Sequence, residues 1–388
     1  MQKTLGGAFL VVGTTIGAGM LSLPLITAAC GLWLSIILII LSWSVMYFTS
    51  LKLIRLCENQ SLGVNYTSLI KSSMPIPLQV IFTIVYLLLL YALMSAYTTQ
   101  GASLVAVVSA TKKIPVAIDV IIFVLIFGMI ILNTKLSDYI NRSFVSIKII
   151  FYTLCILSML FYLKINNMIS GPISLYAIIF AWPTLLPSFG FQNIIPVLYE
   201  YQKGDTLAIK RSVLIGSLIV LIIYIMWLFV CLSILPQHGL NGYGDIFAQG
   251  NTLESFIATI SNSIHNSFIN TFLAIFINIS VITSFICAGL SLYHYIKDTF
   301  KRCGYELNKT FGFVLTFTPP FCFTTFYPKG FILALQYAAI FAVIIFVFTP
   351  IYLDIKNRYK VTNIYPLTLG SLVIIAQIIN LTYSFSPF

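Results

Sequence analysis

Residues 13–24 of the chain read GTTIGAGMLSLP and lie in the middle of a long apolar stretch. The run combines glycines, hydroxyl side chains and a proline, all of which weaken a helix. A second run of this kind, WPTLLPSFGFQNIIP at 182–196, follows five apolar spans later. Backbone released from a helix in hydrocarbon is costly unless it faces protein or a wet cavity. We therefore predict two broken membrane helices with a functional reason for each break.

Two interpretations of these interruptions differ in their chemistry. In the first, small residues such as Gly13 and Gly17 bring helices into close contact. In the second, half-helix N-termini offer N–H donors to a carboxylate, and opposite ends offer carbonyl oxygens to an ammonium group. Interruptions at matched positions of two five-helix halves favour the second interpretation, because this pattern marks the substrate site of secondary transporters.

The composition is that of a membrane protein. Of 388 residues, 59% are hydrophobic and only 8% are charged, and the mean hydropathy is +1.01. A soluble domain carries roughly 25% charged residues, so cytosolic enzymes, nucleic-acid-binding proteins and disordered chains are excluded. Since a span needs about 20 apolar residues, we predict an all-helical membrane protein. We expect eleven spans, at 5–29, 32–54, 78–109, 116–133, 139–163, 174–199, 212–235, 267–295, 311–327, 331–353 and 364–385.

The 21 Lys and Arg residues alternate between the two sides of these spans. Sixteen fall in the segments on the same side as the N-terminus, four fall in the others, and Lys148 lies inside a span. Because cytoplasmic loops carry the excess of basic residues, we predict a cytoplasmic N-terminus and a periplasmic C-terminus. The net charge of +11 thus records orientation and not a nucleic-acid partner. Seven scattered cysteines show no metal-binding or disulfide spacing.

The largest outer segment, 236–266, is too polar to span the membrane and too short for a domain. We expect a short surface helix near 252–265. The segment is either a plain connector or an outer lid.

Several motifs resemble those of the bacterial hydroxy and aromatic amino acid permeases, a family of the amino acid-polyamine-organocation superfamily with tyrosine-specific and tryptophan-specific members. The motifs are VGTTIGAGML at 12–21, residues 141–151, SFGF at 188–191, TSF at 283–285 and FYPKGF at 326–331. The resemblance covers nearly the whole chain. One departure is Gln192, which stands where the family pattern leads us to expect a histidine, and a neutral amide cannot titrate.

The resemblance implies the leucine-transporter (LeuT) type of fold, a five-plus-five inverted repeat in which helices 1 and 6 are broken. On this basis residues 1–165 form the first repeat, 166–355 form the second, and 356–388 form a peripheral eleventh helix. It also implies proton-driven amino acid uptake across a bacterial inner membrane.

Lys148 lies about nine residues into a span that starts near 139, roughly 14 Å deep at 1.5 Å per residue. An unpaired ammonium in hydrocarbon costs about 2.5–3.5 kcal/mol and commonly marks an ion or proton pathway. The alternative is a snorkelling lysine whose head reaches the interface. The resemblance implies that Lys148 corresponds to a fifth-helix lysine that replaces bound sodium in related transporters, with Thr283 and Ser284 beside it. For these two hydroxyls the alternative is ordinary bonding back into their own helix.

The predicted substrate site takes its residues from the two breaks and from the span at 78–109. The breaks are expected to hold the carboxylate and ammonium groups, and the span is expected to help line the aromatic ring. Ordinary packing is the alternative for each aromatic residue. The predicted substrate-binding residues are Thr14, Thr15, Gly17, Ala18, Gly19, Tyr91, Ser95, Ser188, Phe189, Gly190, Phe191 and Gln192.

We therefore predict a proton-coupled symporter that imports an aromatic amino acid, tyrosine ahead of tryptophan, by alternating access. The alternative is a transporter of the same fold for tryptophan, serine or another neutral amino acid. A membrane-embedded enzyme would need a cluster of His, Asp or Glu such as HExxH, and the sequence has none. A channel, the other alternative from a different class, would need a pore signature or an oligomeric ring. We expect no cofactor and no metal site, with protons as the coupling ion and sodium as the alternative. The expected partners are the amino acid substrate and the lipid bilayer, with no nucleic acid and no obligate protein partner.

Overall fold

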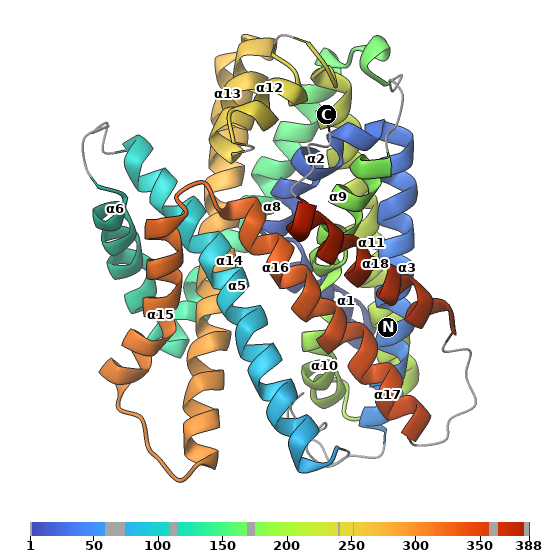
Figure 1. Ribbon diagram of the computed structural model, residues 1–388, viewed down its shortest axis with the longest axis vertical. Helices are drawn as coiled ribbons and strands as arrows, with labels where there is room; N and C mark the ends of the chain where they lie inside the picture. The colour runs from blue at the N-terminus through green and yellow to red at the C-terminus, as the bar shows by residue number, and fades with distance from the viewer. Residues whose placement is uncertain are drawn as a thin grey trace. The chain divides into compact units, whose positions relative to one another are not determined.

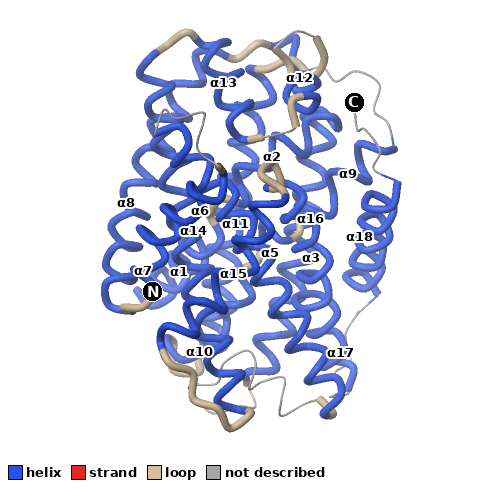
Figure 2. The backbone as a smooth tube through the Cα atoms, turned by 60° about the vertical axis from the view of Figure 1, so that its left-hand side comes forward, coloured by secondary structure: helices blue, strands red, loops and turns tan. Residues whose placement is uncertain are grey.

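The computed structural model describes residues 2–58, 74–108, 115–168, 175–239, 241–250, 252–356, 364–383 and 388. Within these ranges every regular element is a helix (Figures 1 and 2). Among the described residues, eight helical runs are long and apolar enough to cross a membrane, and Val116–Ile131 is a shorter apolar helix. The all-helical membrane class is thus confirmed. The described part of each predicted span is mainly helical, and residues 109, 174 and 384–385 lie outside the described residues. Eleven as the number of crossings stays a prediction.

The helices form two compact units whose segments alternate along the sequence. Unit 1 draws on Met1–Tyr86, Ile169–Phe229 and Ala339–Phe388, and unit 2 on Leu87–Met168 and Val230–Ala338. These units follow spatial contact, so they do not coincide with the inverted repeats predicted at 1–165 and 166–355. The repeats stay a prediction.

Unit 1 contains both interrupted helices and the last helix of the chain. Its elements are α1 (Gln2–Thr15), α2 (Gly19–Thr27), η1 (Ala28–Cys30), α3 (Gly31–Cys57), α9 (Leu175–Leu185), η5 (Pro187–Phe189), η6 (Phe191–Ile194), α10 (Ile195–Tyr201), η7 (Ile344–Phe348), α17 (Thr349–Lys356) and α18 (Ile364–Tyr383). Most of α11 (Thr206–Ile234) also belongs to it.

Unit 2 contains the helices that carry Lys148 and the outer segment. Its elements are α6 (Val116–Phe123), η2 (Val124–Gly128), α7 (Met129–Ile131), α8 (Thr134–Met159), η3 (Leu160–Tyr162), η4 (Ile165–Met168), α12 (Tyr243–Ala248), α13 (Leu253–Ile264), α14 (Ser267–Arg302) and α15 (Lys309–Phe326). It also holds most of α5 (Ile76–Val108) and of α16 (Phe331–Val343), and α8 packs along α14.

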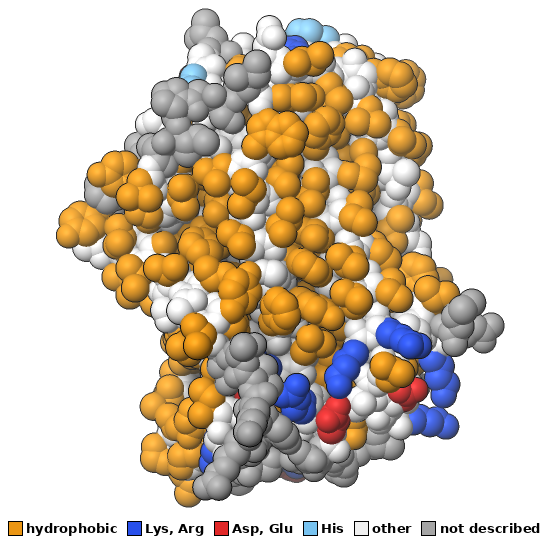
Figure 3. Space-filling model, turned by 90° about the vertical axis from the view of Figure 1, so that its right-hand side faces the viewer, with side chains coloured by type: hydrophobic (Ala, Val, Ile, Leu, Met, Phe, Trp, Pro, Cys, Tyr) orange, Lys and Arg blue, Asp and Glu red, His pale blue; other side chains and the backbone are white. Residues whose placement is uncertain are grey.

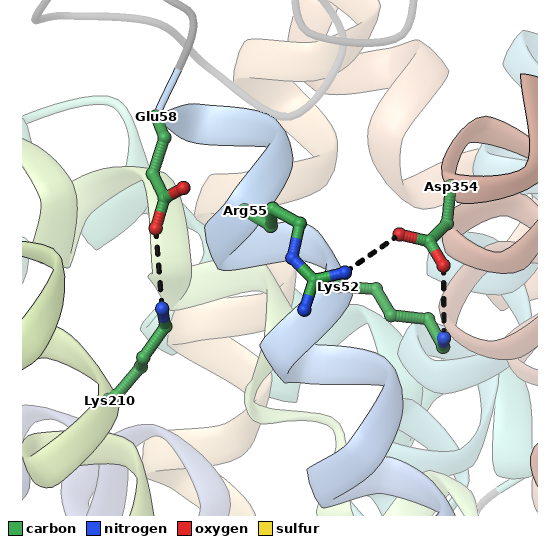
Figure 4. Close-up of polar contacts among 5 residues, drawn as sticks. All are labelled: Lys52, Arg55, Glu58, Lys210 and Asp354. Carbon is green, nitrogen blue, oxygen red and sulfur yellow. Dashed lines mark hydrogen bonds and ion pairs between the residues drawn. The ribbon is translucent and has the colours of Figure 1, made fainter. Parts of the chain in front are cut away.

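Ion pairs in unit 1 join helix ends that the charge count assigns to the cytoplasmic side. At the end of α3, Lys52 lies 3.1 Å from one carboxylate oxygen of Asp354 on α17, and Arg55 lies 3.5 Å from the other (Figure 4). At the start of α11, Lys210 lies 3.3 Å from Glu58. On the face drawn in Figure 3, most charged side chains gather toward one end, beside a broad band of hydrophobic side chains. These contacts agree with the predicted alternation of helix direction.

In unit 2, helix ends that are predicted to lie on the outer side also contact one another. The Asn167 amide, after α8, donates to the Ile234 carbonyl at the end of α11 over 3.0 Å. The predicted surface helix near 252–265 is confirmed as α13, whose start is capped by the Thr252 hydroxyl accepting from the Ser255 amide over 3.2 Å. This helix buries its apolar side and packs on α12 and α14. The described part of the outer segment therefore folds within unit 2, and its use as a lid stays a prediction.

Candidate functional site

The first predicted break is confirmed. α1 ends at Thr15 and α2 begins at Gly19. The Ile16 amide still bonds to the Val12 carbonyl over 3.0 Å, as in an α-helix, and the α-helical pattern then lapses until Gly19. Glycine is the weakest helix former apart from proline, and Gly17 lies inside the gap. Both Gly17 and Gly19 are partly exposed, so their backbone is within reach of a ligand.

The second predicted break is also confirmed. α9 ends at Leu185, two short 3₁₀ turns follow on either side of Gly190, and α10 begins at Ile195. Pro187 opens the first turn and Pro196 lies at the start of α10. Because proline lacks an N–H and clashes with the carbonyl four residues back, it starts a helix but does not continue one. The proline spacing thus explains both ends of the interruption.

The two breaks adjoin inside unit 1. α2 packs against η5, and α1 packs against η6. A Cβ atom placed on Gly19 would lie 3.8 Å from the Ser188 hydroxyl, which is ordinary van der Waals contact. The hydroxyl of Tyr224, on α11, lies 2.9 Å from the Thr15 carbonyl oxygen and 2.9 Å from the Ser188 carbonyl oxygen. One buried side chain therefore contacts the edges of both breaks.

Sequence reasoning missed Tyr224. It lies in a long apolar helix, where a tyrosine is typical of ordinary packing. No spacing in that helix distinguishes it from the other aromatic residues. Its role depends on contacts with segments that are far away in the sequence.

The alternative interpretation, close helix packing at the glycines, finds no support at Gly13 within the described residues of unit 1. Apart from its chain neighbours and the backbone of its own helix, no heavy atom of the described residues lies within 4 Å of a Cβ placed there. Gly13 and Thr14 are both exposed. Space for a neighbouring helix therefore does not explain a glycine at this position.

The hydroxyl groups at the first break bond into their own helix. Thr14 donates to the Leu10 carbonyl over 2.9 Å, and Thr15 donates to the Val11 carbonyl over 2.6 Å. Such back-bonding uses the hydroxyl hydrogen and leaves only lone pairs for a ligand. Donors for a carboxylate at this break would therefore come from the backbone.

Aromatic side chains surround the second break. Phe189 and Phe191 are fully buried, and the Phe189 ring lies 5.1 Å from the Tyr224 ring. A Cβ atom placed on Gly190 would lie 3.8 Å from the Phe346 ring, in the π-helical turn η7. Phe346 is a neighbour that sequence reasoning missed, because the uniformly apolar sequence around it, IIFVF, offered no signal. The break thus combines partly exposed backbone at Gly190 with apolar walls.

Gln192 points to α3. Its amide nitrogen donates to the Met46 carbonyl over 3.1 Å and to the Thr49 hydroxyl over 3.2 Å. The side chain is fully buried, and its carbonyl oxygen has no hydrogen-bond partner among the described residues. The amide therefore cross-links the second break to a neighbouring helix of unit 1.

The candidates on α5 lie in unit 2. The hydroxyl of Tyr91 donates to the Leu315 carbonyl of α15 over 2.9 Å, and Ser95 is buried one turn further on. Near the same end of α5, the Thr99 and Thr324 hydroxyls are 3.1 Å apart. Tyr91 thus holds α5 against α15, a tether that the sequence did not reveal.

Lys148 lies on α8 and is only 3% exposed. Cys287 of α14 is within electrostatic range of its ammonium, one helical turn after Thr283 and Ser284. Thr283 is buried and donates to the Ser280 carbonyl over 3.1 Å, the back-bonding considered as the alternative for it. The three residues predicted for coupling are therefore on two packed helices of unit 2, at neighbouring levels.

Comparison with known proteins places the chain in a family. The model of the tryptophan/tyrosine permease family matches residues 1–384. The chain belongs to this family. It is 32% identical to tyrosine-specific transport system 1 of Haemophilus influenzae, over 98% of this chain and 94% of that protein. It is 27% identical to a tryptophan-specific transport protein of the same organism, over 92% of this chain and 88% of that protein.

Solved transporter structures show the same fold. A manganese transporter of Eremococcus coleocola aligns with a TM-score of 0.62 and 14% identity, over 97% of this chain and 85% of that one. Mhp1, a nucleobase-cation-symport-1 family transporter, aligns with a TM-score of 0.61 and 13% identity, over 99% and 94%. At these identities the likeness concerns the fold alone. The permease thus has the LeuT-like fold and is a multi-pass transporter rather than an enzyme, as predicted.

Proposed function

We propose that this permease is a proton-coupled symporter that imports an aromatic amino acid, tyrosine ahead of tryptophan, by alternating access. The observation that carries the proposal is the meeting of two broken helices in unit 1, beside buried aromatic side chains. A zwitterion needs N–H donors and carbonyl acceptors in one place, and helix breaks supply both. The tyrosine-specific relative at 32% identity supports tyrosine as the first choice.

The polar end of the substrate would bind the breaks. In this proposal the backbone at Gly17–Gly19 and at Gly190 faces the carboxylate and ammonium groups, and Phe189 and Phe191 form apolar walls. The sequence-based assignment of Tyr91 and Ser95 to the substrate site stays a prediction. The proposal gives the threonine hydroxyls at 14 and 15 an accepting role, because their hydrogens are already used.

The coupling proton would bind Lys148. A lysine that is 3% exposed in an apolar helix gains or loses its charge in a medium that solvates ions poorly, so its two protonation states favour different surroundings. Thr283 and Ser284 would supply oxygen acceptors for the ammonium form. In this proposal, protonation of Lys148 shifts the balance between the outward-open and inward-open conformations, because the two conformations solvate the ammonium group differently.

The proposed arrangement in the membrane has eleven crossings, with inverted repeats at 1–165 and 166–355 and a peripheral helix at 356–388. The N-terminus lies in the cytoplasm and the C-terminus in the periplasm of a bacterial inner membrane. The distribution of Lys and Arg along the chain supports this orientation.

Uptake by the purified protein in proteoliposomes tests the function. We expect radiolabelled tyrosine to accumulate when the outside is more acidic than the inside, and only to equilibrate without the gradient. Unlabelled tryptophan should compete, and serine and leucine should not. Equal transport of serine and tyrosine would contradict the aromatic assignment, and accumulation driven by sodium alone would contradict proton coupling. Stronger competition by tryptophan than by tyrosine would reverse the order of the two substrates. The tryptophan-specific relative is the reason for including this comparison.

A further inference from the structure

Tyr224 lies where the two broken helices meet, and its chemistry there goes beyond packing. We infer that Tyr224 is a positioning residue whose hydroxyl holds both breaks in one arrangement, so that their backbone is presented to the substrate already ordered. The inference rests on the proposed function for the assumption that the two breaks bind the substrate. The structural part of it, the ordering of the breaks, does not depend on which substrate is carried.

The geometry gives one hydroxyl hydrogen two acceptors. The Tyr224 oxygen is 2.9 Å from the Thr15 carbonyl oxygen, at the end of α1, and 2.9 Å from the Ser188 carbonyl oxygen, inside the second break. Both distances are within the range of a normal hydrogen bond. A hydroxyl has one hydrogen, so the two carbonyls share it or take it in turn. Either way, the hydroxyl attracts two segments whose carbonyl dipoles would otherwise repel each other.

Burial increases the cost of losing the hydrogen bonds of the Tyr224 hydroxyl. The Tyr224 side chain is fully buried, as is the Phe189 ring that packs against it. Water therefore does not replace the hydroxyl readily, and a buried carbonyl without a donor is costly. Loss of the hydroxyl would thus release both segments rather than exchange one partner for another.

The support under the hydroxyl is rigid. Tyr224 lies in the continuous helix α11, near its middle, and its ring packs against the Phe189 ring at a centroid distance of 5.1 Å. The hydroxyls at the breaks themselves bond within their own segments: Thr15 to Val11, and Ser188 to Thr184 at 3.4 Å. An unbroken helix therefore supplies the donor that joins the two broken ones.

Two tyrosine-to-phenylalanine variants isolate the hydroxyl. Y224F keeps the ring and removes the shared donor. Y243F is the matched control, because Tyr243 is also buried but its hydroxyl has no hydrogen-bond partner among the described residues. Burial raises the pKa of the Tyr243 hydroxyl well above its ordinary value, so this change removes no charge either.

Hydrogen–deuterium exchange of the full-length protein in nanodiscs, without substrate, is the first measurement. In Y224F we expect amides in both 13–24 and 182–196 to exchange about tenfold faster, the change expected when one buried hydrogen bond is lost. Exchange in α3 and in unit 2 should stay as in the wild type, and Y243F should leave all of these segments unchanged. No acceleration in either break, acceleration in only one, or equal acceleration throughout unit 1 would overturn the inference.

Tyrosine transport is the second measurement. We expect Y224F to raise the KM for tyrosine about tenfold at similar amounts of folded protein, while the maximal rate changes less, because a disordered site must be ordered on binding. Y243F should match the wild type. An unchanged KM in Y224F, with exchange accelerated, would overturn the link to substrate binding. If the wild type transports neither tyrosine nor tryptophan, the proposed function fails, and the exchange experiment still decides the ordering role.

Discussion

Gln192 occupies the position where the resemblance leads us to expect a histidine, and the structure uses its amide to hold a helix. Its nitrogen donates to α3, at the Met46 carbonyl and the Thr49 hydroxyl. Those two groups keep a hydrogen bond of their own without it, because the Thr49 hydroxyl also lies 3.1 Å from the Met46 carbonyl oxygen. The Gln192 carbonyl oxygen is buried and lacks a partner among the described residues. An apolar side chain of similar size at this position would not make the cross-link to α3. It would also remove the free-energy cost of burying a carbonyl oxygen without a hydrogen bond.

We therefore predict that Gln192→Leu changes the free energy of unfolding by less than about 1 kcal/mol, since the lost bonds and the removed buried acceptor offset each other. Gln192→Glu should be destabilising by several kcal/mol, because it places an unpaired carboxylate in the same buried space. Thermal unfolding in detergent measures both. Proton-driven uptake should persist in Gln192→Leu. Loss of its pH dependence would make residue 192 part of the coupling machinery.

Lys148 is the residue on which proton coupling depends in our proposal. We predict that Lys148→Met abolishes accumulation of tyrosine against a gradient and leaves downhill exchange of tyrosine measurable, because the neutral side chain no longer distinguishes two protonation states. Counterflow and pH-driven uptake in the same proteoliposomes separate the two activities. Lys164→Met, in an outer segment, is the matched control and should keep both. Accumulation by Lys148→Met at wild-type level would show that the proton binds elsewhere.

At the scale of elements, glycines at the two breaks have different surroundings. A Cβ atom at Gly190 would lie 3.1 Å from the Pro187 carbonyl oxygen, which is backbone and must shift by a few tenths of an ångström. A Cβ atom at Gly13, within α1, has no described atom within 4 Å apart from its chain neighbours and the backbone of its own helix. The same substitution therefore tests whether the backbone of the second break has a required position.

We predict that Gly190→Ala destabilises the protein by about 1–3 kcal/mol, as overpacking does, and raises the KM for tyrosine severalfold. Gly13→Ala should be neutral or stabilising by up to about 1 kcal/mol, because alanine is the better helix former. Unfolding midpoints and uptake kinetics of the two variants give the comparison. A severe loss in Gly13→Ala would revive the close-packing explanation for the first glycine.

The ion pairs between α3 and α17 differ sharply in burial from the neighbouring pair. Asp354 is fully buried between Lys52, which is 4% exposed, and Arg55, whereas Glu58 and Lys210 are about a third or more exposed (Figure 4). Removing one member of a buried pair leaves an uncompensated charge. An exposed pair contributes little because water screens it.

We predict that Asp354→Asn lowers the free energy of unfolding by about 3–5 kcal/mol, and that Glu58→Gln lowers it by less than about 1 kcal/mol. Combining Asp354→Leu with Lys52→Met should recover part of the loss, since an apolar pair of similar volume replaces a buried ion pair at little cost. Thermal unfolding of the set decides the matter. Equal effects of Asp354→Asn and Glu58→Gln would mean that burial does not control the strength of these contacts.

The elements also show what sequence alone can predict. Prolines and glycines act locally, so the positions of both breaks followed from residues such as Gly17, Pro187 and Pro196. Hydrogen bonds between distant segments are not encoded locally. Tyr224 looks like an ordinary membrane aromatic in sequence, yet its hydroxyl contacts both breaks. Tyr91 was predicted to line the substrate site, and the sequence did not reveal that its hydroxyl bonds to α15. The helices were therefore predictable, and the hydrogen bonds of these two tyrosines were not.

For the whole molecule, the charge pattern carries the most information. Contacts within unit 1 join ends predicted to lie inside, such as Lys210 with Glu58, and contacts within unit 2 join ends predicted to lie outside, such as Asn167 with Ile234. These pairs show which ends share a side of the membrane. Which of the two sides is cytoplasmic follows only from the basic residues.

Labelling of cysteines tests that orientation. Cys303 is exposed just after α14, in a segment that we place in the cytoplasm. We predict that a membrane-impermeant maleimide labels it in inverted vesicles and not in intact spheroplasts, because the thiolate must be reached from water. Lys164→Cys in a Cys303→Ser background should show the opposite pattern, since residue 164 lies in a segment placed outside. Labelling of both positions from one side would contradict an odd number of crossings between them, and exchange of the two patterns would reverse the orientation of the whole permease.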